Sequence, residues 1–502
     1  MNLKDLLSHL PDAQHDGPLQ RPVAGLSTRA WRVMPNHVFF AIPHPESNPA
    51  GLVHRALARH PAAIVSEHHV FTTDQTTLIT VPSLPEAMAR AADVFYEQPS
   101  RKLRIIAVAG NSDSPAPLLV AVQRLLEGAG IPCGRISRLG HQLGERILPA
   151  SRTPLDIVEL QELLHLMVRA GCRACVLDLG LVAPLDRWPS GLHFDVLLTA
   201  TTETANTPVD PSLTRELPRN GSAHVRTAFH AHVGSQPQAA GPWHWQIALE
   251  SNGCSVASIQ ARRVATTAQG TRLVIQYGAN SAPLRTAWLG HDAIGQGLTA
   301  MALGQMLGFP IPLLQRALAA APAVPGHLEL VRAGQPCLVA VDHARQPRSL
   351  ARALETLRPL APGRLLLLFG CPAGTSQSHR QAMGRIAAQL ADLTVLTGDD
   401  PCHESPDRIC QQILHGYRQF CLDAPFIQTD RQAAIEMILR LARPGDAVLL
   451  AGKGGCPLQR VGDTIAPFDD GLIATEILEN LGYTLPARRT PRRTPVYGTA
   501  IA

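Results

Sequence analysis

The sequence predicts an α/β fold with several domains, and three observations lead to this fold class. The chain has 502 residues, 45% of them hydrophobic and 17% charged, which is a globular composition with room for about three domains. A β-rich run at 104–109 leads through Gly110 into an amphipathic stretch at 116–130, and this order of strand, loop and helix opens an α/β domain. Beyond residue 326, short apolar runs alternate with helical patterns, which indicates a doubly wound parallel sheet.

The elements before residue 326 are short and irregular. Short apolar runs occur at 38–42, 62–65 and 78–81, and a helix at 84–95 is expected to close this region. Two further strands are expected at 174–179 and 195–199, followed by a long loop at 199–222. β-Hairpins are expected at 243–277 and a helix at 292–307. A proline-rich joint at 321–326 separates them from the regular part of the chain.

After this joint the alternation becomes regular. Strands are expected at 337–341, 364–369, 393–396 and 447–450. Helices are expected near 349–357, 380–390, 407–414 and 431–441. The last residues, 486–502, are basic and contain proline, so we expect a disordered tail.

Charge and lysine usage exclude several function classes. The net charge is +5, too dilute to indicate nucleic acid or a membrane surface, and no apolar run approaches the ~20 residues that span a bilayer. The only lysines are Lys4, Lys102 and Lys453, which excludes chemistry that needs a lysine between them at 103–452. The ten cysteines follow no disulfide framework, which favours reduced thiols and a cytoplasmic location.

Three loops follow strand ends in the C-terminal part, where α/β folds place their ligands. They read VDHARQP at 341–347, FGCPAG at 369–374 and AGKGG at 451–455. Together with GDDPCHESP at 398–406 and WLGHDAIGQGLTAMALGQM at 288–306, these loops resemble the Mur ligase family, in particular its MurE-type tripeptide synthetases.

The resemblance implies a three-domain Mur ligase architecture, with a central P-loop-like α/β domain and a C-terminal Rossmann-like doubly wound sheet. We expect a UDP-sugar-binding-like domain at 1–100, a central domain with a degenerate ATP site at 101–325, a C-terminal domain at 326–485 and the tail at 486–502. The positions that match the family's UDP-sugar contacts are Leu26, Thr28, Thr153 and Arg187.

The family's phosphate loop corresponds to residues 107–116, and most of its functional groups are replaced. Gly110 is kept, but Asp113 stands at the second glycine, Ser114 at the lysine and Pro115 at the metal-binding hydroxyl. A carboxylate repels a triphosphate, and proline removes an N–H that would face phosphate. We therefore expect ATP to bind poorly or not at all, so that no cofactor is needed.

Other positions of the catalytic machinery also depart from the family. Asp178 stands at the magnesium-binding glutamate, which leaves a weak metal ligand, and no lysine exists where the family carries a carbamylated one. The asparagines that meet adenine correspond to Ala293 and Gln296, and the arginine after the joint corresponds to His327. Asp342 and Lys453 remain as catalytic remnants. An exposed turn lysine would explain Lys453 equally well, and an aspartate after a strand, such as Asp342, is more often a turn or cap residue than a catalytic one.

The amino-acid pocket is kept in part. Arg380 matches the arginine that grips the incoming amino acid's carboxylate, although a surface ion pair would explain it as well. Asp399 and Gly452 match neighbouring positions, and Asp400 is expected in the same pocket although it departs from the family's DNPR loop. Cys402 replaces the arginine that reads diaminopimelate. This pocket is not a diaminopimelate site by the resemblance, and a smaller amino acid stays open.

The favoured hypothesis is a pseudoenzyme that binds a UDP-N-acetylmuramoyl peptide or a cell-wall enzyme in a regulatory or scaffolding role. The first alternative is an active amide ligase with a rebuilt nucleotide site, which would need ATP and Mg²⁺. The second is an assembly module that binds only protein. No nucleic-acid partner and no membrane insertion are expected.

Overall fold

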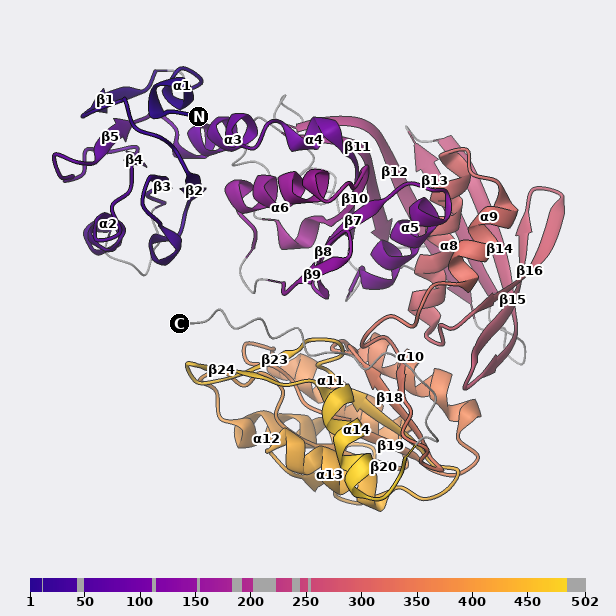
Figure 1. Ribbon diagram of the computed structural model, residues 1–502. Coiled ribbons are helices and arrows are strands. Elements are labelled where there is room, and N and C mark those ends of the chain that lie inside the picture. The colour runs from indigo at the N-terminus through magenta and orange to yellow at the C-terminus, as the bar shows by residue number, and fades with distance from the viewer. Residues whose placement is uncertain are drawn as a thin grey trace. The chain divides into compact units, whose positions relative to one another are not determined.

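The computed structural model describes residues 1–10, 12–42, 49–110, 114–150, 154–182, 192–201, 223–236, 244–251 and 254–484 (Figure 1). The chain forms two compact units. Unit 1 comprises Met1–Gly110, Gly130–Thr199 and Asn206–His230, and unit 2 comprises Asn111–Ala129, Ala200–Ala205 and Ala231–Ala502. Both units combine helices with parallel strands, which confirms the α/β class.

Unit 1 begins with a five-stranded sheet in the order β1-β5-β4-β3-β2. Its strands are parallel except for β1. The strands are β1 (Gln14–Asp16), β2 (Gly25–Ser27), β3 (His37–Phe40), β4 (Ala63–Ser66) and β5 (Thr77–Thr80). The helices are α1 (Leu3–Leu7), the 3₁₀ turn η1 (Ala30–Arg32), α2 (Pro49–Leu57) and α3 (Leu84–Phe95), and Ser83 caps α3 by accepting from the Glu86 N–H.

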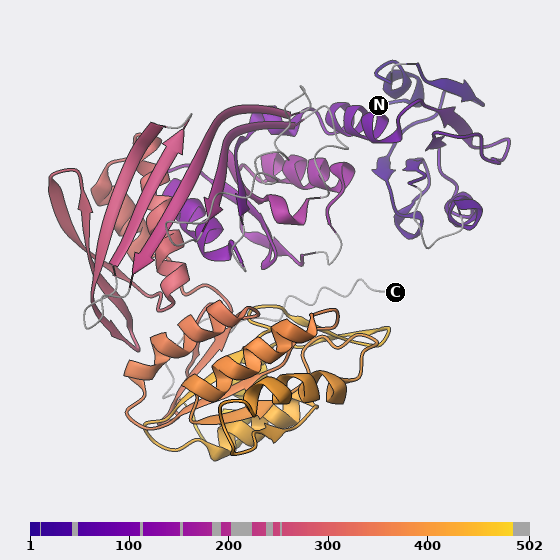
Figure 2. The same cartoon turned by 180° about the vertical axis from the view of Figure 1, so that it is seen from behind.

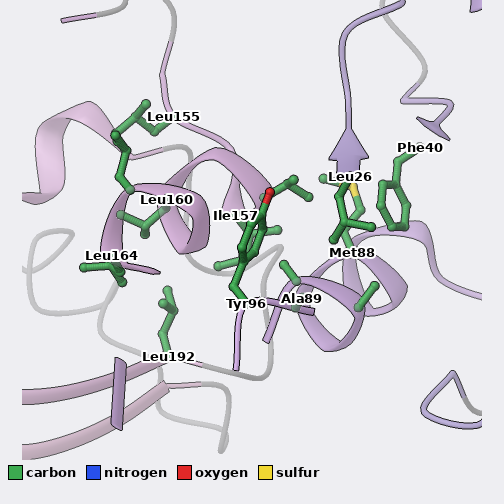
Figure 3. Packing of buried hydrophobic residues seen from close by; sticks show 14 of the residues in the cluster. Leu26, Phe40, Met88, Ala89, Tyr96, Leu155, Ile157, Leu160, Leu164 and Leu192 are labelled. Carbon is green, nitrogen blue, oxygen red and sulfur yellow. The ribbon is translucent and has the colours of Figure 1, made fainter. Parts of the chain in front are cut away.

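A second set of strands in unit 1 runs in the order β11-β6-β10-β7-β8-β9, with β6, β10 and β7 parallel. These are β6 (Arg104–Gly110), β7 (Cys133–Ser137), β8 (Gly140–Leu143), β9 (Arg146–Leu148), β10 (Ala174–Asp178) and β11 (Leu192–Thr201). The helical segments are α4 (Pro99–Lys102), α6 (Ile157–Arg169) and η2 (Leu179–Leu181). Figure 3 shows the core that α3 and α6 share, where Met88 and Tyr96 lie close to Ile157.

Unit 2 contains antiparallel strands in the order β16-β15-β14-β13. Strand β12 (Ala223–Gln236) lies beside β13 and belongs to unit 2 from Ala231 onward. The further strands of this sheet in unit 2 are β13 (His244–Ser251), β14 (Cys254–Thr267), β15 (Gly270–Tyr277) and β16 (Asn280–Thr286). Helices α8 (His291–Met306) and α9 (Ile311–Ala319) pack on one face of this sheet, and α5 (Ala116–Gly128) packs against both helices.

The remaining part of unit 2 is a six-stranded sheet in the order β17-β18-β22-β19-β20-β21, parallel except for β17. The strands are β17 (Glu329–Val331), β18 (Leu338–Asp342), β19 (Leu365–Phe369), β20 (Leu393–Leu396), β21 (Phe426–Ile427) and β22 (Ala447–Ala451). The helical segments are α10 (Pro347–Leu357), η4 (Arg358–Leu360), α11 (Gln377–Leu390), α12 (Pro406–Tyr417), α13 (Arg431–Leu441) and α14 (Asp470–Asn480), and β23 (Leu458–Val461) pairs with β24 (Thr464–Pro467) as a hairpin.

Alternate residues of the central strands enter two cores, one on each face of this sheet. In β22, Leu449 joins the core under α10, α11 and α12, while Val448 and Leu450 join the core under α13 and α14. A strand covered on both faces is apolar throughout, which explains the continuous apolar runs of the sequence. The doubly wound C-terminal sheet is thereby confirmed.

The predicted elements of the C-terminal sheet agree with the structure within a few residues, and the helix expected at 84–95 is α3. Helices α1, α2, α4, α6, α9 and α14 were not predicted from the sequence. The loop expected at 199–222 lies outside the described residues from 202 onward, as does the tail at 486–502. Among the described helices, none is both long and apolar enough to cross a membrane.

Candidate functional site

The first turn of α5 stands where a P-loop would present N–H groups to phosphate. Pro115 and Pro117 carry no N–H. The Ala116 N–H donates to Ser114 Oγ at 3.3 Å, and the Leu118 N–H donates to Gln296 Oε1 at 3.0 Å. Every backbone position from 115 to 118 therefore either lacks a donor or has already used it.

Gln296 of α8 fixes this arrangement from outside the helix. Its Nε2 donates to the Ser114 carbonyl at 3.1 Å, so both ends of the amide bind the start of α5. Only 4% of Gln296 is exposed, and Ser114 is also buried. Buried polar groups that pair with one another are costly to separate, so an incoming ligand would have to replace both hydrogen bonds.

The residues described here do not fit a bound triphosphate. A helix N-terminus binds phosphate through unpaired N–H groups and its positive dipole end. At α5 those N–H groups are missing or occupied, and Ser114 supplies no positive charge. Asn111, Ser112 and Asp113 lie outside the described residues. The repulsion of a triphosphate by the Asp113 carboxylate therefore stays a prediction from the sequence.

A cavity of about 330 Å³ lies next to Gln296 within unit 2. The starts of α5, α8 and α10 meet at it, and its charged and polar lining comprises Ser114, His291, Asp292, Gln296, His327, Asp342, His343, Gln346, Arg348, Ser349 and Arg352. Arg352 of α10 forms an ion pair with Asp292 of α8 across this cavity. The volume is at the lower end of the range for small-molecule pockets.

Two histidines of this cavity, His291 and His327, are held neutral by burial. Burial lowers the pKa of His327 to about 4, and burial also lowers the pKa of His291. Burial alone would raise the pKa of Asp292, but its hydrogen bond with His291 and the charge of Arg352 outweigh this and lower it. At neutral pH His291 and His327 are therefore neutral imidazoles beside an ionised carboxylate paired with arginine.

Asp342, at the end of β18, supports the joint before the C-terminal sheet. Its Oδ2 accepts the Leu328 N–H at 2.7 Å, and Leu328 has a left-handed backbone with φ of 47°. The neighbouring His343 N–H donates to the Gly326 carbonyl at 2.8 Å. Asp342 thus lines the cavity and also fixes the chain at the joint.

Asp178, the proposed metal ligand, ends β10 in unit 1. Its Oδ1 accepts the Gly180 N–H at 2.9 Å, and its Oδ2 lies 3.8 Å from Arg138 Nε. Burial raises the pKa of Asp178 in spite of both neighbours. A nearby guanidinium disfavours a cation, and the described residues contain no group of three or more His, Cys, Asp or Glu side chains that could hold a metal. Asp178 therefore offers a cation a single carboxylate, which already accepts the Gly180 N–H and lies near the Arg138 guanidinium.

Lys453 is fully buried at the carboxyl end of β22. Its Nζ donates to the Leu458 carbonyl at 2.7 Å and to Asp400 Oδ1 at 3.3 Å, and it lies 5.6 Å from the centre of the Phe468 ring. Burial alone would raise the pKa of Asp400, but the charge of Lys453 and the Arg460 N–H outweigh it and lower that pKa. Neither an exposed turn lysine nor a cation of the cavity describes this residue.

Asp399 and Gly452 meet beside Lys453. A Cβ at Gly452, whose φ is 108°, would lie 2.9 Å from Asp399 Oδ2, so only glycine allows this approach. Asp399 is completely buried, and burial raises its pKa, while Arg345 Nη2 lies 3.5 Å from its Oδ1. The structure thus brings together, at the carboxyl ends of β20 and β22, the residues Asp399, Asp400, Gly452 and Lys453.

Arg380 is engaged inside the C-terminal sheet domain. Its Nη1 donates to Glu404 Oε1 at 2.6 Å, and its Nη2 donates to Glu404 Oε2 at 2.7 Å. Nη1 also donates to Gln412 Oε1 at 2.9 Å, and Nη2 donates to the Pro372 carbonyl at 3.1 Å. Only 2% of Arg380 is exposed. A ligand carboxylate would have to displace Glu404 to reach this guanidinium.

In unit 1, the two described positions of the UDP-sugar prediction lie in different surroundings. Leu26 belongs to the buried core (Figure 3), whereas Thr28 Oγ1 donates to Asp156 Oδ2 at 2.5 Å. Asp156 is also the N-cap of α6, so Thr28 joins the N-terminal sheet to that helix. Thr153 and Arg187 lie outside the described residues.

Three features of these sites were missed by sequence reasoning. Pro117 removes a second donor from α5, and its position two residues after Pro115 could have indicated this. The partnership of Gln296 with α5 spans 178 residues of sequence and has no local signal. Glu404 could not be recognised as the partner of Arg380, because a single glutamate in a loop does not reveal its contact.

Comparison with known proteins places these features in a family. Residues 326–454 match the family model described as Mur ligase, glutamate ligase domain. The UDP-N-acetylmuramoyl-L-alanyl-D-glutamate–2,6-diaminopimelate ligase of Thermosynechococcus vestitus is 30% identical over 488 residues, covering 94% of this chain and 96% of that protein. The UDP-N-acetylmuramyl-tripeptide synthetase of Roseiflexus sp. is 28% identical over 515 residues, covering 96% and 100%.

Solved structures support the same fold. A diaminopimelate ligase of this kind aligns with a TM-score of 0.55 at 19% identity, covering 96% of this chain and 100% of that chain. MurF from Acinetobacter baumannii aligns with a TM-score of 0.60 at 13% identity, covering 95% and 98%. At such identities the structural likeness establishes the fold alone.

Proposed function

The chain belongs to the Mur ligase family, and we propose that it works there without ATP-dependent ligase chemistry. Its role is to bind a UDP-N-acetylmuramoyl peptide or a cell-wall enzyme and thereby to regulate or scaffold peptidoglycan precursor synthesis. The relatives that span nearly the whole chain are named for the step that uses UDP-N-acetylmuramoyl-L-alanyl-D-glutamate, which gives the ligand class.

The observation that carries this proposal is the closed first turn of α5. A triphosphate gains its affinity from N–H groups and cations that are already in place before it binds. Here Pro115 and Pro117 have no N–H, and Gln296 occupies the N–H of Leu118. Removing one such preorganised donor typically costs on the order of 10²–10³ in rate, and several are missing at once.

Two further contacts support a loss of ligase activity. Arg380, which by the resemblance would hold the amino acid's carboxylate, is paired with Glu404 through both terminal nitrogens. Lys453 is buried and bonded to Asp400, so it cannot supply a cation to the cavity without leaving that partner. Both groups contribute to the stability of the C-terminal sheet domain in this arrangement.

Calorimetry with AMPPNP and Mg²⁺, together with a phosphate-release assay on UDP-N-acetylmuramoyl-L-alanyl-D-glutamate and a panel of amino acids, tests the proposal. We expect neither nucleotide binding nor phosphate release from this protein. The Thermosynechococcus ligase serves as the positive control under the same conditions. Saturable AMPPNP binding that disappears in Lys453→Ala would instead establish the rebuilt ligase.

A thermal-shift panel tests the binding role separately. UDP-N-acetylmuramoyl dipeptide and tripeptide are expected to raise the melting temperature, since a ligand that binds only the folded state stabilises it. ATP is expected to leave the melting temperature unchanged. If neither muramoyl compound raises it, binding of these precursors is contradicted, and the protein-only assembly module takes its place.

The contribution of the Gln296 hydrogen bonds to the start of α5 can be measured as a change in the free energy of unfolding. Gln296→Ala leaves the Leu118 N–H and the Ser114 carbonyl buried without their partner, so we expect a loss of about 1–3 kcal/mol in the free energy of unfolding by urea. Gln419→Ala, at an exposed position, is the matched control and should stay within about 0.5 kcal/mol of wild type. Equal effects of the two substitutions would contradict the assigned role of Gln296.

A further inference from the structure

The antiparallel sheet of unit 2 has one face without a covering helix among the described residues. Helices α8 and α9 pack on its inner face, and Figure 2 shows the strands from the opposite side. On β15 the burial alternates, with Leu273 and Ile275 buried while Arg272 and Gln276 are exposed. The outward-facing side of β15 is therefore polar.

The charge of this surface is almost entirely positive. Between residues 223 and 286 the chain contains five arginines and a single acidic residue, Glu250. Three of these arginines, Arg262 on β14, Arg272 on β15 and Arg285 on β16, have exposed side chains in strands that are neighbours in the sheet. Residues 223–286 carry a net charge of +4, whereas the net charge of the whole chain is only +5.

The strand register brings two of these charges together. Arg272 lies directly opposite Arg285, and like charges at directly opposed positions destabilise a sheet. Arg262 pairs with Val274, two residues along β15 from Arg272, and therefore lies on the same part of the surface. All ion pairs recorded for the described residues involve other side chains, so none of them neutralises these three arginines.

We propose that the outer face of β14, β15 and β16 docks the acidic surface of a partner protein. Guanidinium groups bind carboxylates in bidentate fashion, and Arg is enriched in protein–protein interfaces. An anionic partner would relieve the repulsion between Arg272 and Arg285, which gives it a gain that a neutral partner lacks.

The neighbouring side chains favour protein over the other anionic partners. A row of amides formed by Gln246, Gln260 and Gln276 crosses the same face in register, and amides can bond to peptide groups. Binding of single-stranded nucleic acid uses exposed aromatic side chains for stacking, and no exposed aromatic side chain accompanies the arginines on β14, β15 and β16. Val264 is the sole large exposed apolar residue there, which is too little to insert into a membrane surface.

Phenylglyoxal footprinting on the full-length wild-type protein tests the location of the surface. The probe is a fluorescein-labelled 20-residue polyglutamate peptide, and mass spectrometry reports the modification of each arginine. Binding should protect Arg262, Arg272 and Arg285 at least threefold, while exposed arginines elsewhere, such as Arg59 and Arg385, stay unprotected. Protection spread evenly over all arginines would overturn the proposal.

Fluorescence anisotropy with the same peptide tests the energetics. The triple substitution Arg262→Glu, Arg272→Glu and Arg285→Glu should weaken binding at least tenfold and flatten its dependence on salt, because fewer ions are released. The matched control carries Arg59→Glu, Arg385→Glu and Arg418→Glu, which changes the net charge equally at other exposed positions. An equal loss in both variants would show a net-charge effect and overturn the proposal.

Two competing probes distinguish the class of partner. A single-stranded 20-mer of deoxythymidine and vesicles with 30% phosphatidylglycerol are measured at the same ionic strength. If one of these probes binds more tightly than polyglutamate and loses affinity in the triple variant, that result overturns the acidic protein as the partner and identifies nucleic acid or lipid instead. The outcome is independent of ATP binding, so this proposal and the proposed function can fail separately.

Discussion

Arg380 and Glu404 show at the residue scale how an internal contact can replace a ligand. By the resemblance, Arg380 would meet the carboxylate of an amino acid, and in this chain Glu404 supplies a carboxylate that Arg380 binds in bidentate geometry. The hydrogen bond to Glu404 raises the pKa of Arg380, while the hydrogen bond from Arg380 lowers the pKa of Glu404. The pair therefore keeps both of its charges at neutral pH.

Because Glu404 supplies the carboxylate that Arg380 binds, we expect a small carboxylate to rescue the stability of a variant without this side chain. Glu404→Ala leaves Arg380 buried without its main partner, and the expected loss is about 3 kcal/mol in the free energy of unfolding. Acetate at tens of millimolar should restore part of this stability, because a small carboxylate can enter the space that the side chain left. Urea titrations with acetate or chloride at equal ionic strength measure both effects.

The control for this rescue is an exposed ion pair. Glu436 and Arg440 pair at i,i+4 on α13 with side chains 47% and 60% exposed. Glu436→Ala should therefore cost no more than about 0.5 kcal/mol and show no gain from acetate. The same acetate response in both variants would mean that the anion acts generally rather than at Arg380.

At the scale of elements, the joint before the C-terminal sheet depends on one glycine. Gly326 has a φ of 67°, and a Cβ there would lie 1.8 Å from the Gly455 nitrogen in the loop after β22. The Gly326 carbonyl accepts the His343 N–H, so three segments meet at this point. The backbone is thus packed so closely at Gly326 that there is no room for a side chain at this position.

This packing predicts a large effect of Gly326→Ala. The substitution adds backbone strain and forces the Gly455 loop away, which should cost about 2–3 kcal/mol more than strain alone. Gly308→Ala is the control, because Gly308 has a φ of 86° with nothing within 4 Å of its Cβ position. Thermal melts of the two variants measure the difference, and similar melting temperatures would contradict the close packing.

The elements also determine what a ligand can find at α5. The helix begins after Pro115, and prolines at the first positions suit a helix start because their missing N–H needs no partner there. The same choice removes the donors that make a helix start attractive to phosphate. Local stability of α5 and affinity for a triphosphate are therefore opposed in this sequence.

At the scale of the whole molecule, buried histidines predict the response of stability to acid. Burial lowers the pKa of His141 to about 4, from an ordinary value of 6.5. The folded protein thus keeps His141 neutral, whereas the unfolded chain takes up a proton below pH 6.5. Stability is complete above pH 6.5 and is lost as the pH falls towards 4, by at most about 3 kcal/mol for this group.

His141→Leu tests this dependence. The variant lacks the proton uptake of the unfolded state, so its free energy of unfolding should fall less than that of wild type between pH 7 and 4.5. His54→Leu, at an exposed position on α2, is the matched control and should keep the wild-type slope. Urea titrations at four pH values give the slopes, and parallel curves for all three proteins would refute the assignment to His141.

By itself, the sequence determined the α/β class, the doubly wound C-terminal sheet and the family. These depend on local signals, because an apolar run between glycine-containing loops predicts a buried strand wherever it occurs. It also identified the replaced residue types of the phosphate loop, such as Ser114 and Pro115, since a missing lysine or N–H is a property of the residue itself.

Only the tertiary structure decided which groups meet. Gln296 reaches Leu118 over 178 positions, Lys453 binds Asp400 instead of facing the cavity, and strand register places Arg272 opposite Arg285. The physical reason is that these contacts join segments distant in sequence, whose approach depends on the packing of whole helices and sheets. A residue's type shows what it can bind, and the fold determines what is within reach.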